Sequence, residues 1–83
     1  MKVKDRVIIR TVTYHYTGEV VSVDSTWVTL KNAAWVADSG RWSNALKTGE
    51  LSEVEPYPDE CTIAVGAIVD WSPWLHALPR DVK

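Results

Sequence analysis

The sequence predicts a mainly β protein, a strongly bent five-stranded antiparallel barrel with a short helix between the third and fourth strands. Three observations favour this fold. Segments rich in Val, Ile, Thr and aromatic residues recur along the chain, short polar turns separate them, and a glycine interrupts the last segment. Such residues fit a pleated, half-buried surface. With 83 residues, the chain is expected to form one domain, 1–83, that packs compactly or gains burial by oligomerising.

The first three strands are expected to form an antiparallel meander. Residues 6–16 predict a long strand that bends and changes its buried face, because neither of its faces is purely apolar. The Thr-Gly pair at 17–18 then turns the chain into a second strand, 19–23. The Asp-Ser pair at 24–25 forms the next reversal, because both side chains readily bond nearby backbone. Residues 26–35 complete the meander as the third strand.

The remaining segments predict a short helix and two more strands. Ser43 can cap a helix over 44–48, and Gly49 ends it in the left-handed conformation. Residues 51–57 alternate as a fourth strand, which prolines close, because proline cannot donate a ladder hydrogen bond. Residues 62–71 form the fifth strand, in which the central glycine marks a bend or a close backbone approach.

Charge and composition exclude several classes of protein. The net charge of −2, from nine basic and eleven acidic residues, provides no overall positive field for a nucleic acid. Cys61 is the only cysteine, which excludes an intrachain disulfide and a multi-cysteine zinc site. No apolar run approaches the roughly 20 residues that span a bilayer. We therefore expect no membrane partner and a cytoplasmic location.

The residues that could carry catalysis are sparse. His15 and His76 have no second ligand at metal-binding spacing. Glu53 and Glu55 share one face of the expected fourth strand, where the alternation indicates a solvated surface. No phosphate-binding loop or nucleophile motif occurs. The sequence thus predicts a protein that is not an enzyme, with no catalytic residue, no metal and no cofactor.

Two segments resemble motifs of a known family. The first comprises Gly18, Val20, Val23, Asp24, Val28, Leu30 and Asn32, and the second runs over 63–69. Their spacing is similar to that of the Sm/LSm family, most closely its bacterial RNA-chaperone branch, Hfq. This resemblance implies an Sm-like (SH3-like) barrel that closes into a homo-oligomeric ring, a hexamer or heptamer, and binds RNA. Val65 stands where RNA-binding members place a basic residue.

The resemblance also implies how a ring would close. In the family the fourth strand of one subunit pairs with the fifth strand of the next, here 51–57 and 62–71. Exposed strand edges favour such pairing on general grounds. The whole chain is in addition similar to short proteins of tailed phages and marine metagenomes, through 10–14, 32–42 and 66–70. That likeness implies a phage context, with the protein in the host cytoplasm or the virion.

Two surfaces are candidates for contact with RNA or single-stranded nucleic acid. One is the turn at 24–27, where the tryptophan could stack a base or pack in a subunit interface. The other is the basic amino-terminal segment, which would become a basic ring in an oligomer. The candidate residues are Asp24, Ser25, Thr26, Trp27, Lys4, Arg6 and Arg10. A second hypothesis remains open, in which the protein is a phage structural or assembly component and the barrel is a protein–protein interaction module.

Overall fold

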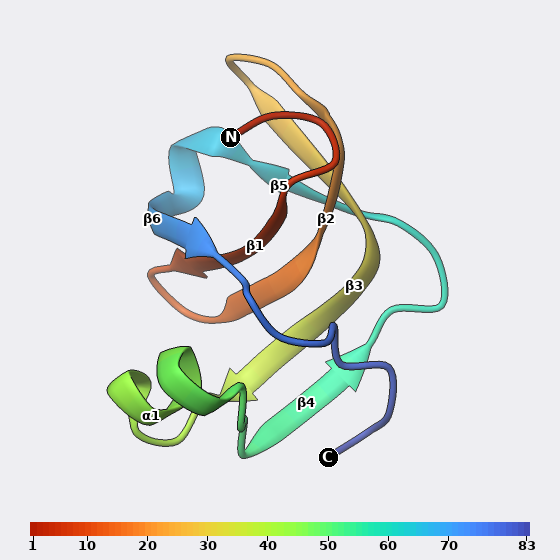
Figure 1. Ribbon diagram of the computed structural model, residues 1–83. Helices are drawn as coiled ribbons and strands as arrows, with labels where there is room; N and C mark the ends of the chain where they lie inside the picture. The colour runs from red at the N-terminus through yellow and green to blue at the C-terminus, as the bar shows by residue number, and fades with distance from the viewer.

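The computed structural model describes residues 1–83 and contains one antiparallel sheet of six strands with a single α-helix (Figure 1). The strands are β1 (Arg6–Thr11), β2 (His15–Val23), β3 (Trp27–Asp38), β4 (Glu53–Pro56), β5 (Cys61–Ala64) and β6 (Ile68–Pro73). Helix α1 (Trp42–Thr48) lies between β3 and β4, and a 3₁₀ turn, η1 (Val65–Ala67), joins β5 to β6. The mainly β class and the place of the helix are therefore confirmed, whereas the strands number six instead of five.

The sheet divides into two parts that share β2 and β3. The strand order is β4-β3-β2-β1-β6. Strand β5 lies outside this path and also pairs with β3. Residues 27–30 of β3 pair with β5, and residues 34–38 pair with β4. We call β6-β1-β2-β3-β5 the barrel half and the part of β2 and β3 beside β4 the open half. The sheet is not closed, because β5 and β6 are joined by η1 and not by ladder hydrogen bonds.

The strand boundaries differ most from the sequence prediction at two places. The first reversal lies at 12–14 and not at 17–18, because Thr11 closes a turn with Tyr14. The amide of Thr11 donates to the Tyr14 carbonyl at 3.0 Å, and the Thr11 hydroxyl oxygen accepts from the Tyr14 amide at 3.1 Å. The expected strand over 62–71 is broken at η1, so its central glycine marks a bend but no close approach.

Gly18 lies within β2, opposite a β-bulge in β3. Asn32 and Ala33 of β3 together face the single residue Gly18, and Asn32 has a φ of 49°. Asn tolerates this left-handed conformation better than most residues. A Cβ added at Gly18 would lie 2.8 Å from the Cβ of Leu30, so only glycine fits without a shift. Because the bulge adds one residue to β3, Leu30 and Ala33 face the same core although they are three positions apart.

The sheet is buried on both faces at its centre. The barrel half encloses Val7, Ile9, Val20, Val28, Leu30, Ala33, Cys61 and Ile63. The opposite face carries Ile8, Ala34, Val36, Ala45, Leu51, Val54 and Trp74. Because successive side chains of a strand point to opposite faces, β1 supplies both cores with apolar residues. The second core is covered by α1 and the carboxyl-terminal segment, 74–83.

Helix α1 starts two residues earlier than predicted and ends where predicted. Ser43 lies inside the helix, and no side chain caps its start. Gly49 has a φ of 81° and its amide donates to the Ala45 carbonyl at 2.9 Å, which confirms the left-handed stop. No helix of the chain has the length and apolar character needed to cross a membrane.

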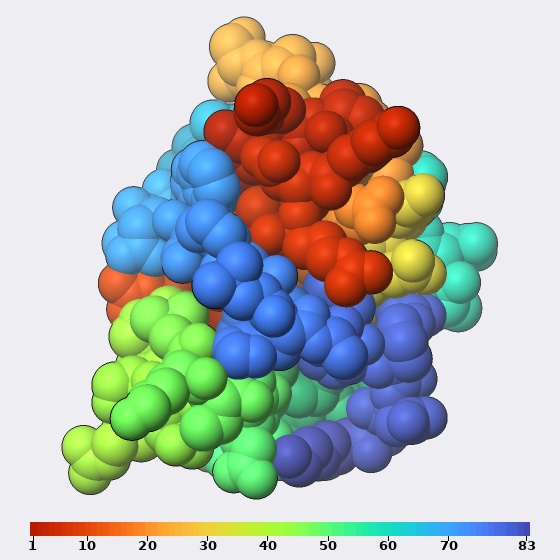
Figure 2. All heavy atoms as spheres, in the orientation of Figure 1, coloured from red at the N-terminus to blue at the C-terminus, as the bar shows by residue number.

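The carboxyl-terminal segment is held against the helix and β4. Nε2 of His76 lies 2.8 Å from the Leu46 carbonyl oxygen. Lys83 and Val54 exchange two backbone hydrogen bonds, of 2.8 and 2.9 Å. In Figure 2 this segment crosses the front of the molecule beside the helix. It therefore occupies part of the outer edge of β4, which the sequence suggested as an edge for subunit pairing.

Candidate functional site

The turn at 24–27 forms as predicted, and its aspartate is used within the turn. Oδ1 of Asp24 accepts from the amides of Thr26 at 2.7 Å and Trp27 at 2.9 Å. These bonds, the one from Trp27 foremost, lower the pKa of Asp24. The carboxylate therefore stabilises the turn, and the backbone amides of Thr26 and Trp27 stabilise its negative charge.

The turn lies next to η1, so the structure brings the two family-like segments together. The Val65 amide donates to the Thr26 carbonyl at 2.9 Å. Trp27 is 52% exposed, which leaves its ring free for a ligand or a partner. A hollow of about 340 Å³ adjoins the turn at Asp24, and its seven lining residues, six of them hydrophobic, do not include Trp27. They are Met1, Val23, Asp24, Val28, Val65, Ile68 and Trp71.

The predicted basic surface is divided. Lys4 and Arg6 line a hollow of about 410 Å³ near the start of β1. Arg10, at the other end of β1, donates from Nε to Oδ1 of Asp70 at 2.8 Å and bonds Oδ2 through a second nitrogen. Its guanidinium also lies 4.8 Å from the ring centroid of Trp42. The hydrogen bonds raise the pKa of Arg10 and lower that of Asp70. Only Lys4 and Arg6 thus remain as a basic pair.

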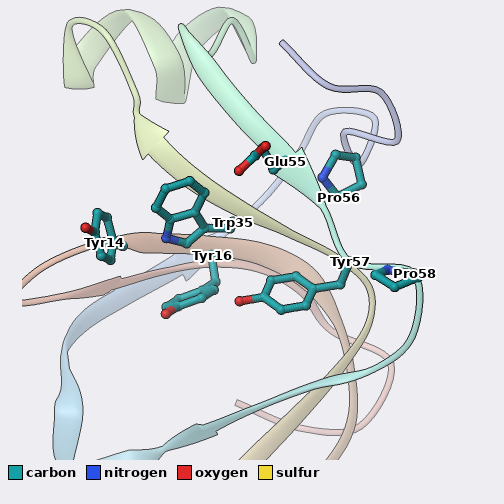
Figure 3. A pocket seen from close by; sticks show the side chains of 7 residues that line it. All are labelled: Tyr14, Tyr16, Trp35, Glu55, Pro56, Tyr57 and Pro58. Atoms are coloured by element: carbon teal, nitrogen blue, oxygen red, sulfur yellow. The ribbon is translucent and has the colours of Figure 1, made fainter.

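A cleft lies in the open half of the sheet, and the sequence analysis did not identify it. Tyr16 of β2, Trp35 of β3 and Glu55 of β4 are register partners in one row across the three strands. The cleft has a volume of about 470 Å³ and is lined by Tyr14, Tyr16, Trp35, Glu55, Pro56, Tyr57 and Pro58 (Figure 3). We call this set the aromatic cleft.

The rings of the aromatic cleft form two pairs. Tyr14 and Trp35 meet edge to face, with centroids 4.8 Å apart and ring planes at 65°. The centroids of Tyr16 and Tyr57 are 6.5 Å apart, with ring planes at 39°. Burial, together with the neighbouring Cys61, raises the pKa of Tyr57 to about 12, and burial also raises that of Tyr16. Both hydroxyl groups are therefore neutral donors at physiological pH.

The position of the cleft explains its aromatic lining. Ala33 and Trp35 lie on the same face of β3, but Ala33 is fully buried inside the barrel half, whereas Trp35 is half-buried. Neither β5 nor β6 reaches over the open half. The core face of the sheet thus continues into solvent. Tyrosine and tryptophan suit that boundary, because they join apolar area to a polar tip.

A second hollow continues the aromatic cleft. It shares Tyr16, has a volume of about 300 Å³, and lies between the β1–β2 turn and the β5–η1 segment. Its other lining residues are Thr11, Val12, Thr13, Thr62, Ile63, Ala64 and Ala67. Together the two hollows form a groove with two successive compartments.

The sequence contained only a weak signal for this site. Tyr14 and Tyr16 share one face by alternation, as do Glu55 and Tyr57. Which of these faces meet depends on the pairing of β2, β3 and β4, which alternation does not specify. Glu55 is exposed, as its alternation with Glu53 predicted, but that alternation did not indicate its aromatic neighbours.

The molecule offers no constellation that points to a metal. No group of three or more His, Cys, Asp or Glu side chains lies close enough together to hold an ion. Comparisons with protein-family models, with curated proteins and with solved structures found no match. The geometry of the surfaces described above is therefore the basis for a functional proposal.

Proposed function

We propose that this chain is a non-enzymatic binding protein that holds an extended segment of a partner protein in the aromatic cleft. The observation that carries the proposal is the row of Tyr16, Trp35 and Glu55 on a core face without cover. Uncovered apolar surface of this kind marks a binding site in soluble proteins. Aromatic grooves are the surfaces on which proline-rich segments dock, because such segments are already extended and lose little entropy.

Charge complementarity favours a basic segment over a nucleic acid at this site. Glu55 is the only charged side chain in the cleft, and the loop after it continues with Asp59 and Glu60. A phosphate group would meet a carboxylate there and no cation. A lysine or arginine beside a proline would instead be attracted. The second compartment of the groove suits the next apolar side chain of the same segment.

Titration of the protein with a panel of proline-containing peptides tests this proposal. The peptides carry one arginine or lysine before or after the proline, and an acidic version of each serves as reference. We expect micromolar binding of basic peptides, followed by tryptophan fluorescence, and at least a tenfold loss in Trp35→Ala. Trp27→Ala is the matched control and should bind normally. Equal losses in both variants, or no peptide bound at millimolar concentration, would overturn the proposal.

We also propose that the barrel half is an Sm-like (SH3-like) barrel. The order β6-β1-β2-β3-β5, with η1 between the last two strands in sequence, supports it. In a phage, a peptide-binding barrel of this kind would serve as a structural or assembly component, in the host cytoplasm or the virion. Interaction through the aromatic cleft needs no oligomer.

A second candidate function is a homo-oligomeric ring, hexameric or heptameric, that binds RNA or single-stranded nucleic acid. It is favoured by the exposed Trp27 beside the turn and by Lys4 and Arg6. Strands β5 and β6 each pair with only one neighbour, so each has an edge available to another copy. Because Lys83 bonds the edge of β4, the edges that would pair between subunits are those of β5 and β6.

Light scattering after gel filtration tests the ring, and fluorescence anisotropy with U-rich and A-rich oligomers tests the ligand. We expect a single oligomeric species and binding that weakens with salt and with Lys4→Ala/Arg6→Ala. Trp27→Ala should reduce affinity without changing the size of the oligomer if the ring stacks on a base. A monomer without affinity for either oligomer would exclude this second function.

A further inference from the structure

We propose that one corner of the aromatic cleft, formed by Tyr14, Trp35 and Glu55, binds a methylated ammonium group. The inference rests on the proposed function and specifies it, because it names the chemical group of the partner segment that the cleft selects. The same group occurs on methylated lysine side chains and on free choline-like molecules. The shared chemistry is a cation that carries methyl groups in place of most or all of its N–H donors.

The ring geometry of the corner suits such a cation. Tyr14 and Trp35 stand at 65° to one another with centroids 4.8 Å apart, so the two rings meet edge to face and do not stack flat. A cation within about 6 Å of a ring centroid is attracted by the negative face of the ring, most strongly with tryptophan. Tyr14 is 44% exposed, so the corner is reached directly from solvent.

Glu55 supplies the charge that the rings lack. It is the direct register partner of Trp35 on the neighbouring strand. Figure 3 shows its carboxylate on the side of the cleft where Trp35 lies. In Figure 3 Trp35 lies between Tyr14 and Glu55, so its indole has a ring on one side and a carboxylate on the other. No lysine or arginine lines the cleft to compete for that carboxylate.

Two bases, Arg80 and Lys31, have partners other than Glu55. Arg80 donates to the backbone carbonyls of Ala33 at 3.1 Å and Tyr57 at 3.3 Å. Lys31 pairs with Glu19 at 3.4 Å. Neither base lines the cleft, so Glu55 is the only charged side chain in its lining.

The composition of the corner selects methylated over unmodified ammonium. A primary ammonium has three N–H donors and is strongly hydrated, so it needs several oxygen acceptors to replace its water. The corner provides one carboxylate and otherwise ring surface. Methyl groups remove the donors, weaken hydration and add apolar area that the rings cover. An inorganic cation would need more oxygen ligands than this.

Choline and its neutral carbon isostere, 3,3-dimethylbutan-1-ol, provide the direct test. The two molecules have the same shape, so a difference in binding reports the charge alone. We expect choline to shift the indole resonance of Trp35 at concentrations at least tenfold lower than the isostere. Glu55→Gln should weaken choline binding by about three- to tenfold, in line with cation–aromatic and charge contributions at exposed sites. Glu53→Gln, an exposed carboxylate outside the cleft on the same strand, is the matched control.

Peptides separate the two sources of the group. A basic peptide in which one lysine is trimethylated should bind more tightly than the unmodified peptide, and Trp35→Ala should remove the difference. Equal binding of choline and its isostere, or equal effects of the two Glu→Gln variants, would refute the corner as a cation site. If peptides bind but methylation and choline have no effect, the proposed function stands and this inference is wrong. If choline binds but no peptide does, the cation site stands and the peptide-binding function fails.

Discussion

Strand β3 has two segments whose side chains on one face of the sheet have different surroundings. Residues 27–31 belong to the barrel half, where Val28 and Leu30 are fully buried under β5 and its neighbours. Residues 34–38 belong to the open half, where Trp35 on that same face is half-buried beside β4. Aliphatic side chains occur where the face is enclosed, and aromatic ones where it ends in solvent.

The contrast shows how one small sheet can present an enclosed face and an open face along the same strand. The bulge at Gly18 and Asn32 bends the sheet, so β5 pairs with one end of β3 and β4 with the other. The core face then extends beyond the barrel. Because no strand covers that extension, its residues are available to a partner. The bulge is therefore the feature on which both halves depend.

The largest expected effect on the free energy of unfolding comes from a substitution at the bulge. Gly18→Ala should lower the free energy of unfolding by about 1–3 kcal/mol, because the new methyl group would overlap the Cβ of Leu30 in a closely packed core. Gly66→Ala is the control, because a Cβ there meets nothing within 4 Å. The free energy of unfolding of Gly66→Ala should stay within about 0.5 kcal/mol of that of the unsubstituted chain. Urea denaturation measures both. Similar losses would show that the contact between β2 and β3 is not the constraint.

A smaller effect separates the half-buried Trp35 from the exposed Trp27. Trp35→Ala should lower the free energy of unfolding by about 1–2 kcal/mol, because it removes the edge-to-face contact with Tyr14 and part of a core face. Trp27→Ala should change it by no more than about 0.5 kcal/mol, because the ring is largely exposed. Thermal unfolding of the two variants compares them. A larger loss in Trp27→Ala would mean that its ring is covered in solution, as in the proposed ring of subunits.

The smallest effect concerns pH and the tyrosines at the border of the two halves. The pKa of Tyr57 is about 12 in the folded chain, above its value of about 10 in an unfolded one. The neutral form thus contributes stability below about pH 10, and this contribution is lost as the pH rises towards 12. Tyr57→Phe should flatten the fall of unfolding free energy over that range. Absorbance of tyrosinate near 295 nm gives an independent reading, and ionisation of Tyr57 at about pH 10 would contradict the burial.

Much of the local structure was predictable from the sequence. The Asp24 turn forms because its carboxylate caps two amides only two and three residues away. The helix ends at Gly49 because only glycine readily adopts a φ of 81°. The first reversal was misplaced, because Thr17 and Gly18 have the composition of a turn although they lie in the middle of a strand. Gly18 is there for a close approach across the sheet, which a local pattern does not distinguish from a turn.

The sequence by itself determined the mainly β class, the order of most elements, the turn at Asp24 and the stop at Gly49. Each depends on short-range propensities and on hydrogen bonds between near neighbours. Only the tertiary structure decided that Tyr16, Trp35 and Glu55 meet in one row, and that Arg10 is paired with Asp70. These contacts depend on strand register, on a bulge and on which face remains uncovered. Register, bulges and uncovered faces depend on contacts between segments that are distant in the sequence, so no local sequence pattern predicts them.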